Sequence, residues 1–347
     1  MRRAADLAAR GTLRVDPNPP VGCVLMRGGR IVGEGFHAAW GGPHAEQEAL
    51  AAAGGRGKRA TAYVTLEPCG HEGKTPPCAP ALARAGIAEV VYAEHDPNPL
   101  TAGLGPRQLR AAGVAVRRAH STRATRALLV RYLAQRELRR PWVIAKWAMT
   151  LDGRLSSRGG DARWVSGEEA RDWGHRELRA RVDAILIGAG TLRLDDPLLT
   201  NRSGRGGSPL RVVVCGRRPL PRDARLFRGG APVLCVAPAG TRLPSGVEVV
   251  RCGARGRVEV RRLLRLLYRR GVRRILVEGG GALLGSFLDG GLVDQAALLL
   301  APKLIGGAGA LVTGRGLGSM EEAARLEHAR VEALGADLLV EGYVSRP

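Results

Sequence analysis

The sequence contains few aromatic side chains and almost no lysine. Aromatic residues make up 4% of its 347 residues, so any hydrophobic core must consist mainly of Val, Leu, Ile and Ala. Among 54 basic residues, only four are lysines: Lys58, Lys74, Lys146 and Lys303. Because lysine offers a compact ammonium group that arginine does not replace, these four positions are candidates for specific roles.

Long apolar runs are also missing. No run reaches the roughly 18 residues that a membrane span needs, and residues 1–14 lack the continuous apolar core of a signal peptide. Six cysteines in a chain of this length do not require a disulfide framework. We therefore expect a cytoplasmic protein without membrane contact, in which neighbouring cysteines bind metal rather than each other.

The formal net charge of +22 favours a nucleic-acid partner at first sight. The arginines, however, are scattered through both halves of the chain rather than gathered in one arm or stripe. An arginine-for-lysine bias of this extent indicates codon usage. The alternative is a positive field that collects phosphorylated small molecules or nucleic acid. We predict no nucleic-acid partner.

The pattern of apolar residues predicts two α/β domains, over residues 1–140 and 141–347. In the first, predicted strands and helices alternate: a hairpin at 21–37, strands at 61–68 and 88–94, and helices at 2–12, 44–53, 79–86, 106–112 and 121–140. Pro141 ends the last helix. In the second, strands are expected from 142 and at 182–188, 210–216, 232–237, 273–281 and 296–304, with helices at 167–179, 258–270 and 282–289.

One constellation of residues carries recognisable chemistry. The tripeptide HAE at 44–46 is followed by PCGHEGKTPPC at 68–78. His44, Cys69 and Cys78 supply three of the four ligands of a tetrahedral zinc ion and leave one position for water, as catalytic zinc sites do. The ion lowers the pKa of that water, and Glu46 is left to carry protons. This H-x-E…P-C…C order is the general pattern of nucleobase deaminases.

Two alternatives to a catalytic zinc site are a structural zinc site and unrelated buried cysteines. A structural site usually has four protein ligands and leaves Glu46 without a purpose. The cysteine spacing departs from the general C-x-x-C pattern, because eight residues separate Cys69 from Cys78. The remaining cysteines lie in or beside apolar strands and are predicted to belong to the core: Cys23, Cys215, Cys235 and Cys252.

Several strings resemble a known family. DPNPPVGC (16–23), HAE, TLEPCGHEGKTPPC (65–78) and HDPNP (95–99) are similar to the N-terminal domain of the bifunctional riboflavin biosynthesis proteins, which are pyrimidine deaminase/reductases. The wide cysteine spacing matches this family. The second half resembles its reductase domain in KWAMTLDGR (146–154), RWVSG (163–167), GAGTLRLDDPLLTNR (188–202), VEGGGALLGSF (277–287) and APKLIGG (301–307).

The resemblance implies a cytidine-deaminase-like domain followed by a dihydrofolate-reductase-like domain. It implies hydrolytic deamination of 2,5-diamino-6-(5-phosphoribosylamino)pyrimidin-4(3H)-one and then reduction of the ribosyl group to ribityl by NADPH. The cofactors would be Zn²⁺ and NADPH, the partner a phosphorylated pyrimidine, and the assembly a homo-oligomer. The deaminase substrate would contact Asn18, His37, His71, Lys74, Asp96 and Asn98. Asn18 in a turn and His37 at a strand end also have purely structural explanations.

The resemblance also assigns residues of the reductase. NADPH would contact Ala148, Trp164, Thr191, Asp195, Gly216, Gly280, Gly281, Ala282, Leu283, Leu284, Gly285 and Ser286. The sugar phosphate would contact Lys146, Ala162, Arg179, Leu199, Arg202 and Glu278. From the residues alone, VEGGG is a weak signal, because its glycines do not match G-x-G-x-x-G and a plain strand-to-helix turn would explain them. With fifty arginines in the chain, Arg179 and Arg202 also fit solvated surface positions.

Two departures from the family pattern concern the reductase. Ala162 stands where a serine hydroxyl is common, and the segment between Trp164 and Arg179 is one residue longer than usual. The first leaves open a protein active only as a deaminase, and the second makes the position of Arg179 less secure. A deaminase acting on tRNA adenosine is a further alternative, but it leaves about 200 residues of a second α/β domain without a purpose.

Overall fold

The computed structural model describes residues 1–73, 75–98, 101–162, 165–203, 207–228, 230–253, 256–307 and 311–345, without the side chains at 131 and 134–137. Lys74 and Trp164 therefore lie outside the described residues. The chain forms two compact units, Met1–Glu137 and Leu138–Pro347, divided close to Pro141. Among the described helices, none combines the length and apolarity needed to cross a bilayer.

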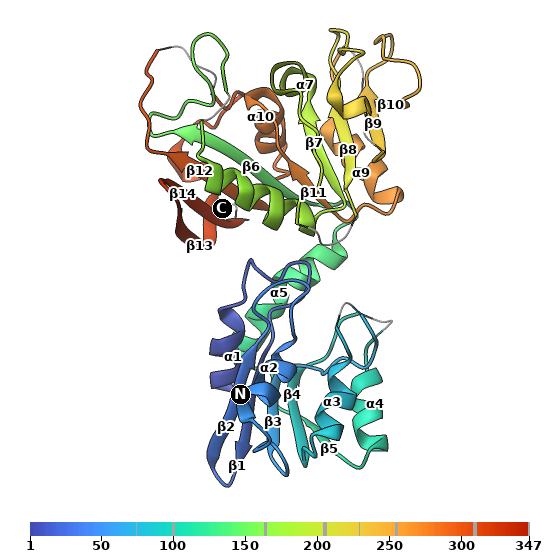
Figure 1. Ribbon diagram of the computed structural model, residues 1–347, viewed down its shortest axis with the longest axis vertical. Helices are drawn as coiled ribbons and strands as arrows, with labels where there is room; N and C mark the ends of the chain where they lie inside the picture. The colour runs from blue at the N-terminus through green and yellow to red at the C-terminus, as the bar shows by residue number, and fades with distance from the viewer. Residues whose placement is uncertain are drawn as a thin grey trace. The chain divides into compact units, whose positions relative to one another are not determined.

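The first unit is built on a five-stranded sheet in the order β2-β1-β3-β4-β5 (Figure 1). Its strands are β1 (Gly22–Arg27), β2 (Arg30–Phe36), β3 (Thr61–Leu66), β4 (Glu89–Glu94) and β5 (Ala115–Arg118). β1 pairs antiparallel with β2 and β3. β3, β4 and β5 are parallel, so the carboxyl ends of these three strands lie at one edge.

Helices cover both faces of this sheet. They are α1 (Arg2–Ala9), α2 (Ala45–Ala53), α3 (Cys78–Arg84), α4 (Leu104–Ala111) and α5 (Arg123–Glu137). Successive residues of β1 point to opposite faces. Cys23 packs with residues of α2, α3 and α4, whereas Val24 packs with Ala4 and Leu7 of α1. The result is a three-layer α/β/α unit whose core is mostly Ala, Val and Leu.

The sheet and α2 approach each other closely at Gly35. A Cβ atom at this position would lie 2.4 Å from the carbonyl oxygen of Ala45, in the first turn of α2. Only glycine tolerates such a contact between backbones. Since His44 immediately precedes α2 and Glu46 lies in its first turn, this close approach fixes the depth at which both side chains enter the unit.

The second unit contains a nine-stranded sheet in the order β10-β9-β8-β7-β11-β6-β12-β14-β13. Its strands are β6 (Trp142–Thr150), β7 (Ala184–Gly188), β8 (Leu210–Val214), β9 (Val233–Ala237), β10 (Glu248–Arg251), β11 (Arg274–Val277), β12 (Gln295–Ala301), β13 (Arg325–Leu334) and β14 (Asp337–Ser345). The strands from β10 to β12 are parallel, and β14 and β13 extend the sheet antiparallel.

The helices of the second unit are α6 (Glu168–Trp173), a π-helix (Gly174–Leu178), a 3₁₀ turn (Arg179–Arg181), α7 (Ala189–Asp195), α8 (Arg225–Arg228), α9 (Val260–Arg269), α10 (Gly281–Asp289) and a 3₁₀ turn (Met320–Glu322). Leucines of α9 and Phe287 of α10 pack against the parallel strands in one apolar cluster. The single helix predicted at 167–179 is wrong, because the structure divides it into α, π and 3₁₀ parts. β5, α7, α8, β10, β13 and β14 were not predicted; β5 and β10 are only four residues long and largely exposed.

Candidate functional site

The three predicted zinc ligands converge in the first unit. The Nδ1 atom of His44 lies 3.5 Å from the Sγ atom of Cys69 and 3.4 Å from that of Cys78. All three donor atoms lie within 4.8 Å of one another. Zn–S and Zn–N bonds of about 2.3 and 2.1 Å at a tetrahedral angle separate the donors by about 3.6 Å. The spacing and the donor set therefore fit one zinc ion with three protein ligands.

Local structure explains how two distant segments reach one ion. His44 is the N-cap of α2, with a capping box in which Gln47 accepts from the His44 amide. The same Gln47 side chain donates to the carbonyl oxygen of Pro76, at 2.8 Å. Cys78 begins α3, and its amide donates to the Sγ atom of Cys69 at 3.4 Å. These bonds bring both cysteines beside His44, although an insert of eight residues separates them.

The Glu46 carboxyl lies beside this cluster and is only 3% exposed. Burial, followed by the charge of Cys69, raises its pKa to about 7. Its side chain also interacts with Cys78. A carboxyl group with a pKa near neutrality both accepts and releases protons at working pH, which is the property a general acid/base needs.

Asn18 and His37 form a pair next to the zinc ligands. His37 is 2% exposed, and its ring meets the ring of His44 edge-on, with centroids 5.1 Å apart. Burial lowers the pKa of His37 to about 4, although its bond to the Pro43 carbonyl opposes the shift. Nδ1 therefore donates to Pro43 at 2.8 Å, and Nε2 accepts from Nδ2 of Asn18 at 3.1 Å. The strand-end explanation for His37 as an exposed residue is wrong.

The other predicted substrate contacts of the deaminase are placed less uniformly. His71 is exposed in the insert. The Asp96 carboxylate accepts from the amide of Asn98 and from the hydroxyl of Thr101, so it holds its own loop together. Asn98 is half-buried in this loop, and its backbone carbonyl oxygen accepts hydrogen bonds from the amides of Thr101 and Ala102. These contacts give Asp96 a structural role in addition to the predicted one.

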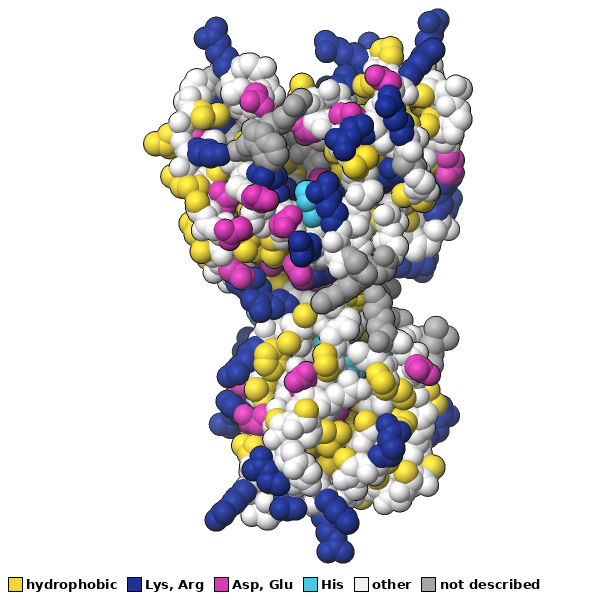
Figure 2. Space-filling model, viewed as in Figure 1, with side chains coloured by type: hydrophobic (Ala, Val, Ile, Leu, Met, Phe, Trp, Pro, Cys, Tyr) yellow, Lys and Arg dark blue, Asp and Glu magenta, His cyan; other side chains and the backbone are white. Residues whose placement is uncertain are grey.

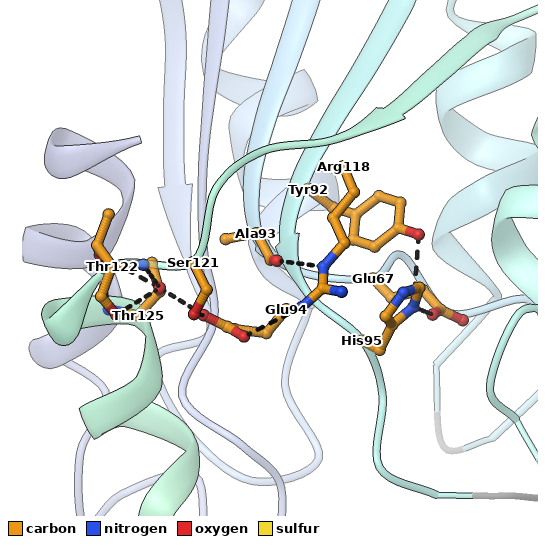
Figure 3. A network of polar contacts seen from close by, with 9 residues as sticks. All are labelled: Glu67, Tyr92, Ala93, Glu94, His95, Arg118, Ser121, Thr122 and Thr125. Atoms are coloured by element: carbon orange, nitrogen blue, oxygen red, sulfur yellow. Dashed lines mark hydrogen bonds and ion pairs between the residues drawn. The ribbon is translucent and has the colours of Figure 1, made fainter.

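Glu67, which sequence reasoning missed, connects the cysteine loop to the loop of Asp96. Figure 3 shows its buried carboxylate against His95, whose Nδ1 lies 3.1 Å from Oε2. The other oxygen accepts from the amide of Gly103. Glu67 directly precedes Pro68 and Cys69, so these bonds hold the segment before a predicted zinc ligand against His95 and Gly103. Its position in TLEPC was the available signal.

A second buried carboxylate in Figure 3 belongs to Glu94, at the end of β4. It accepts from the hydroxyl of Thr125 at 2.6 Å and from that of Ser121. Where α5 begins, the Thr125 hydroxyl accepts a hydrogen bond from the Thr122 amide, and the Thr122 hydroxyl accepts one from the Thr125 amide. The Glu94 network therefore fastens the start of α5 to the sheet.

In the second unit, candidate residues gather where the sheet topology reverses. β7 leads to β8 on one side, whereas the adjacent β11 leads toward β12 on the other. In open parallel sheets, ligands bind beyond the carboxyl ends of strands at such a switch point. Thr191 follows β7 and Gly280 follows β11, and the Gly280 amide donates to the Thr191 hydroxyl at 3.1 Å.

Lys146, Arg179 and Glu278 form a charged cluster at the same end of the sheet. Ala145 pairs with Val277 in the sheet, so the next residues, Lys146 and Glu278, are neighbours. Arg179 donates to both carboxylate oxygens of Glu278, at 3.0 and 2.8 Å, and to the carbonyl of Thr200. Burial alone would raise the pKa of Glu278, but the Arg179 guanidinium holds it at about 2. Burial also lowers the pKa of Lys146.

The π-helix Gly174–Leu178 directly precedes Arg179, in the segment that the family resemblance predicts to be one residue longer. A π turn contains one more residue than an α turn, so it absorbs an additional residue without displacing the residues after it. Arg179 is accordingly 5% exposed and faces Glu278. The surface explanation for Arg179 is wrong. Arg202, by contrast, is exposed.

The remaining predicted contacts of the reductase differ in what they offer a ligand. Leu283, Leu284 and Gly285 are buried in the core face of α10, so only their backbone groups are available. Gly281 and Gly285 also lie against residues 311–313, whose carbonyl groups a Cβ would overlap. The hydroxyl of Ser286 donates to Ala282 within the helix. Ala148 and Ala162 are half-buried, Asp195 is exposed, Leu199 is buried, and Gly216 has open space where a Cβ would stand.

The positive charge does not form one continuous surface on the face drawn in Figure 2. Arginine and lysine side chains are distributed over both units there, and acidic side chains stand among them. This distribution agrees with the scatter of arginines along the sequence.

Two family models match the chain. Residues 1–94 match the zinc-binding region of cytidine and deoxycytidylate deaminases. Residues 141–340 match the RibD C-terminal domain. The mixed α/β architecture with a deaminase unit and a reductase unit is thereby confirmed.

Whole-chain comparisons give the same result. The riboflavin biosynthesis protein RibD of Actinobacillus pleuropneumoniae is 37% identical, covering 100% of this chain and 95% of that relative. RibD of Escherichia coli is 36% identical, covering 97% of this chain and 96% of that relative. The structure of Acinetobacter baumannii RibD has a TM-score of 0.67 at 33% identity, covering 99% of this chain and 98% of the other. A Thermotoga maritima diaminohydroxyphosphoribosylaminopyrimidine deaminase/5-amino-6-(5-phosphoribosylamino)uracil reductase has a TM-score of 0.65 at 34% identity, covering 99% and 97%.

Proposed function

Because this chain belongs to the RibD family, the bifunctional deaminase/reductases of riboflavin biosynthesis, we propose that its two units act in succession on one phosphorylated pyrimidine. Residues 1–140 deaminate 2,5-diamino-6-(5-phosphoribosylamino)pyrimidin-4(3H)-one by hydrolysis. Residues 141–347 then reduce the ribosyl group of the resulting uracil to ribityl with NADPH.

The metal of the first step is held by His44, Cys69 and Cys78. Two thiolates and one imidazole suit zinc, and three protein ligands leave a position open, as in catalytic sites. When bound, zinc supplies Lewis acidity that lowers the pKa of a water molecule to near neutrality. The amide of Cys78 at the sulfur of Cys69 favours the thiolate form of that ligand.

Glu46 moves the protons of the deamination. Its burial and raised pKa support a carboxyl group that moves the two protons of the attacking water in turn, the first to the ring nitrogen and the second to the amino group that departs as ammonia. The neutral His37 holds Nδ2 of Asn18, and so leaves the amide oxygen of Asn18 to accept a hydrogen bond from the pyrimidine. His71, Lys74, Asp96 and Asn98 are proposed to contact the base or the phosphate.

The second step needs alignment more than titrating groups, because NADPH supplies the hydride. Thr191, Gly216 and the backbone of 280–286 are proposed to hold it with Ala148, Trp164 and Asp195. The position of Thr191 and Gly280 at the switch point of the sheet supports a nucleotide there. Lys146, Arg202, Leu199 and Ala162 are proposed to contact the sugar phosphate. Arg179 fixes Glu278, which faces the same site.

One observation carries this proposal: three zinc donor atoms converge on one point beside the buried carboxyl group of Glu46. Glu46→Gln retains the zinc ligands but removes the proton carrier, and we expect ammonia release to fall by about 10²–10⁴-fold. The test measures zinc content by metal analysis and ammonia from the diaminopyrimidine without NADPH. Full ammonia release by a zinc-loaded Glu46→Gln enzyme would reject the assignment.

A further inference from the structure

Several buried polar atoms of the second unit have no hydrogen-bond partner among the described residues, and one of them, Nδ1 of His175, lies beside predicted substrate contacts. His175 lies in the π-helix Gly174–Leu178. Its Nδ1 atom is buried, and among the described residues it has no hydrogen-bond partner. Buried polar groups in proteins nearly always have a partner, so an exception calls for a missing one, such as a ligand or a water molecule.

His175 lies near residues that are predicted to contact the sugar phosphate. The charges that act on its ring belong to Arg179, Glu278, Arg202 and Lys146. A Cβ atom on the preceding residue, Gly174, would lie 3.7 Å from Cε of Lys146, so the lysine side chain passes over this turn. Arg179 follows four residues after His175, a spacing that puts both on one side of a helix.

Arg179 and Glu278 already satisfy each other's hydrogen-bonding groups. Nε and Nη2 of Arg179 bind the two oxygens of Glu278, and Nη1 binds the carbonyl of Thr200. The imidazole is also neutral at working pH, because burial and then the charge of Arg179 lower its pKa to about 4. A neutral imidazole has one donor and one acceptor nitrogen.

These constraints select the chemistry of the missing partner. A phosphate group is matched by the forked donors of an exposed arginine such as Arg202. A hydroxyl group both donates and accepts, so it pairs with Nδ1 in either tautomer of a neutral imidazole. The substrate of the proposed reduction carries such groups on its ribosyl chain.

We propose that His175 is a substrate-contacting residue of the reductase, whose Nδ1 forms a hydrogen bond with a ribosyl hydroxyl group. The inference rests on the proposed function and deepens it. The sequence held one signal for this residue, namely its position four residues before Arg179. His175 binds and orients the sugar and transfers no proton.

The test compares His175→Phe with His175→Asn. Phe keeps the ring and removes both nitrogens, whereas the Asn amide reaches the position of Nδ1 and restores a polar atom there. His120→Phe, at an exposed histidine of the other unit, is the matched control. Binding of 5-amino-6-(5-phosphoribosylamino)uracil is measured by calorimetry without NADPH, and KM and kcat are measured by NADPH oxidation.

We expect His175→Phe to raise the Kd and KM for the uracil by about 3- to 10-fold, the effect of one neutral hydrogen bond. The Kd for NADPH, the unfolding temperature at pH 7.5 and ammonia release should not change, and His175→Asn should restore most of the binding. An unchanged Kd in His175→Phe overturns the inference, and so does an equal loss in both variants. If the wild-type enzyme binds the uracil but does not oxidise NADPH, the proposed function is overturned. The Kd values of the two variants then still test the role of His175. A wild-type enzyme that does not bind the uracil overturns both.

Discussion

The zinc site of the first unit and the charged cluster of the second are organised in different ways. In the first, His44, Cys69 and Cys78 direct their donor atoms at one point and need an ion to complete them. In the second, the guanidinium of Arg179 binds both carboxylate oxygens of Glu278 directly. The comparison suggests that the deaminase depends on its metal for geometry, whereas the reductase depends on an internal ion pair.

Removing one zinc ligand should give the largest difference between the units. Cys78→Ala leaves two donors, and we expect zinc content and ammonia release to fall by at least about 10²-fold while NADPH oxidation on the uracil is retained. Cys252→Ala, at a buried cysteine of the second unit, is the control and should keep its zinc. Equal loss of both activities in Cys78→Ala would mean that the two sites are not independent.

Breaking the ion pair should destabilise the second unit. Arg179→Met leaves the carboxylate of Glu278 buried without its partner, which costs about 3–5 kcal/mol. Thermal unfolding measures this loss, and NADPH oxidation should also disappear. The double variant Arg179→Met/Glu278→Leu should regain most of the stability but no activity. A single variant as stable as the wild type would show that the pair does not organise this site.

Crowding α2 should affect only the first unit. Gly35→Ala places a methyl group against the backbone of α2, and overpacking of this kind costs about 1–3 kcal/mol. Because α2 carries Glu46 and follows His44, the kcat of deamination should fall with stability. Gly207→Ala, where a Cβ would meet nothing, is the control. An unchanged kcat in Gly35→Ala would mean that the depth of α2 does not matter.

Acid should weaken the ion pair of the second unit over a pH range set by the pKa of Glu278. The pKa of Glu278 is about 2 in the folded chain against an ordinary value of 4.5. The pair therefore contributes its full stability above pH 4.5 and loses it as the pH falls through 2. Unfolding of the wild type between pH 4.5 and 2 should show a steeper loss of stability than that of Arg179→Met/Glu278→Leu. Parallel curves would contradict the assigned pKa shift.

The sequence predicted the deaminase site better than the reductase site, for a physical reason. Metal ligands are specific residue types at the ends of elements, so HAE and the two cysteines were recognisable without any relative. The family, the fold and the bifunctional activity expected from the resemblance are confirmed. The individual substrate and cofactor contacts remain predictions.

What could not be predicted depends on contacts between distant segments. The pairing of Arg179 with Glu278 joins residues 99 positions apart, whose proximity depends on sheet order. The π-helix replaced part of a predicted α-helix because hydrophobic periodicity does not distinguish the two over five residues. β13 and β14 were missed because the prediction ended at residue 304, and the exposed side chains of β13 give little alternation to recognise.

The order of the two reactions is the central claim, and one measurement tests it directly. Glu46→Gln is supplied with NADPH and either the diaminopyrimidine or 5-amino-6-(5-phosphoribosylamino)uracil, and NADPH oxidation is followed. We predict oxidation at the wild-type rate with the uracil and about 10²–10⁴-fold less with the diaminopyrimidine. Oxidation of NADPH at the wild-type rate with the diaminopyrimidine would contradict the account, because the reductase would then not require the product of the zinc site.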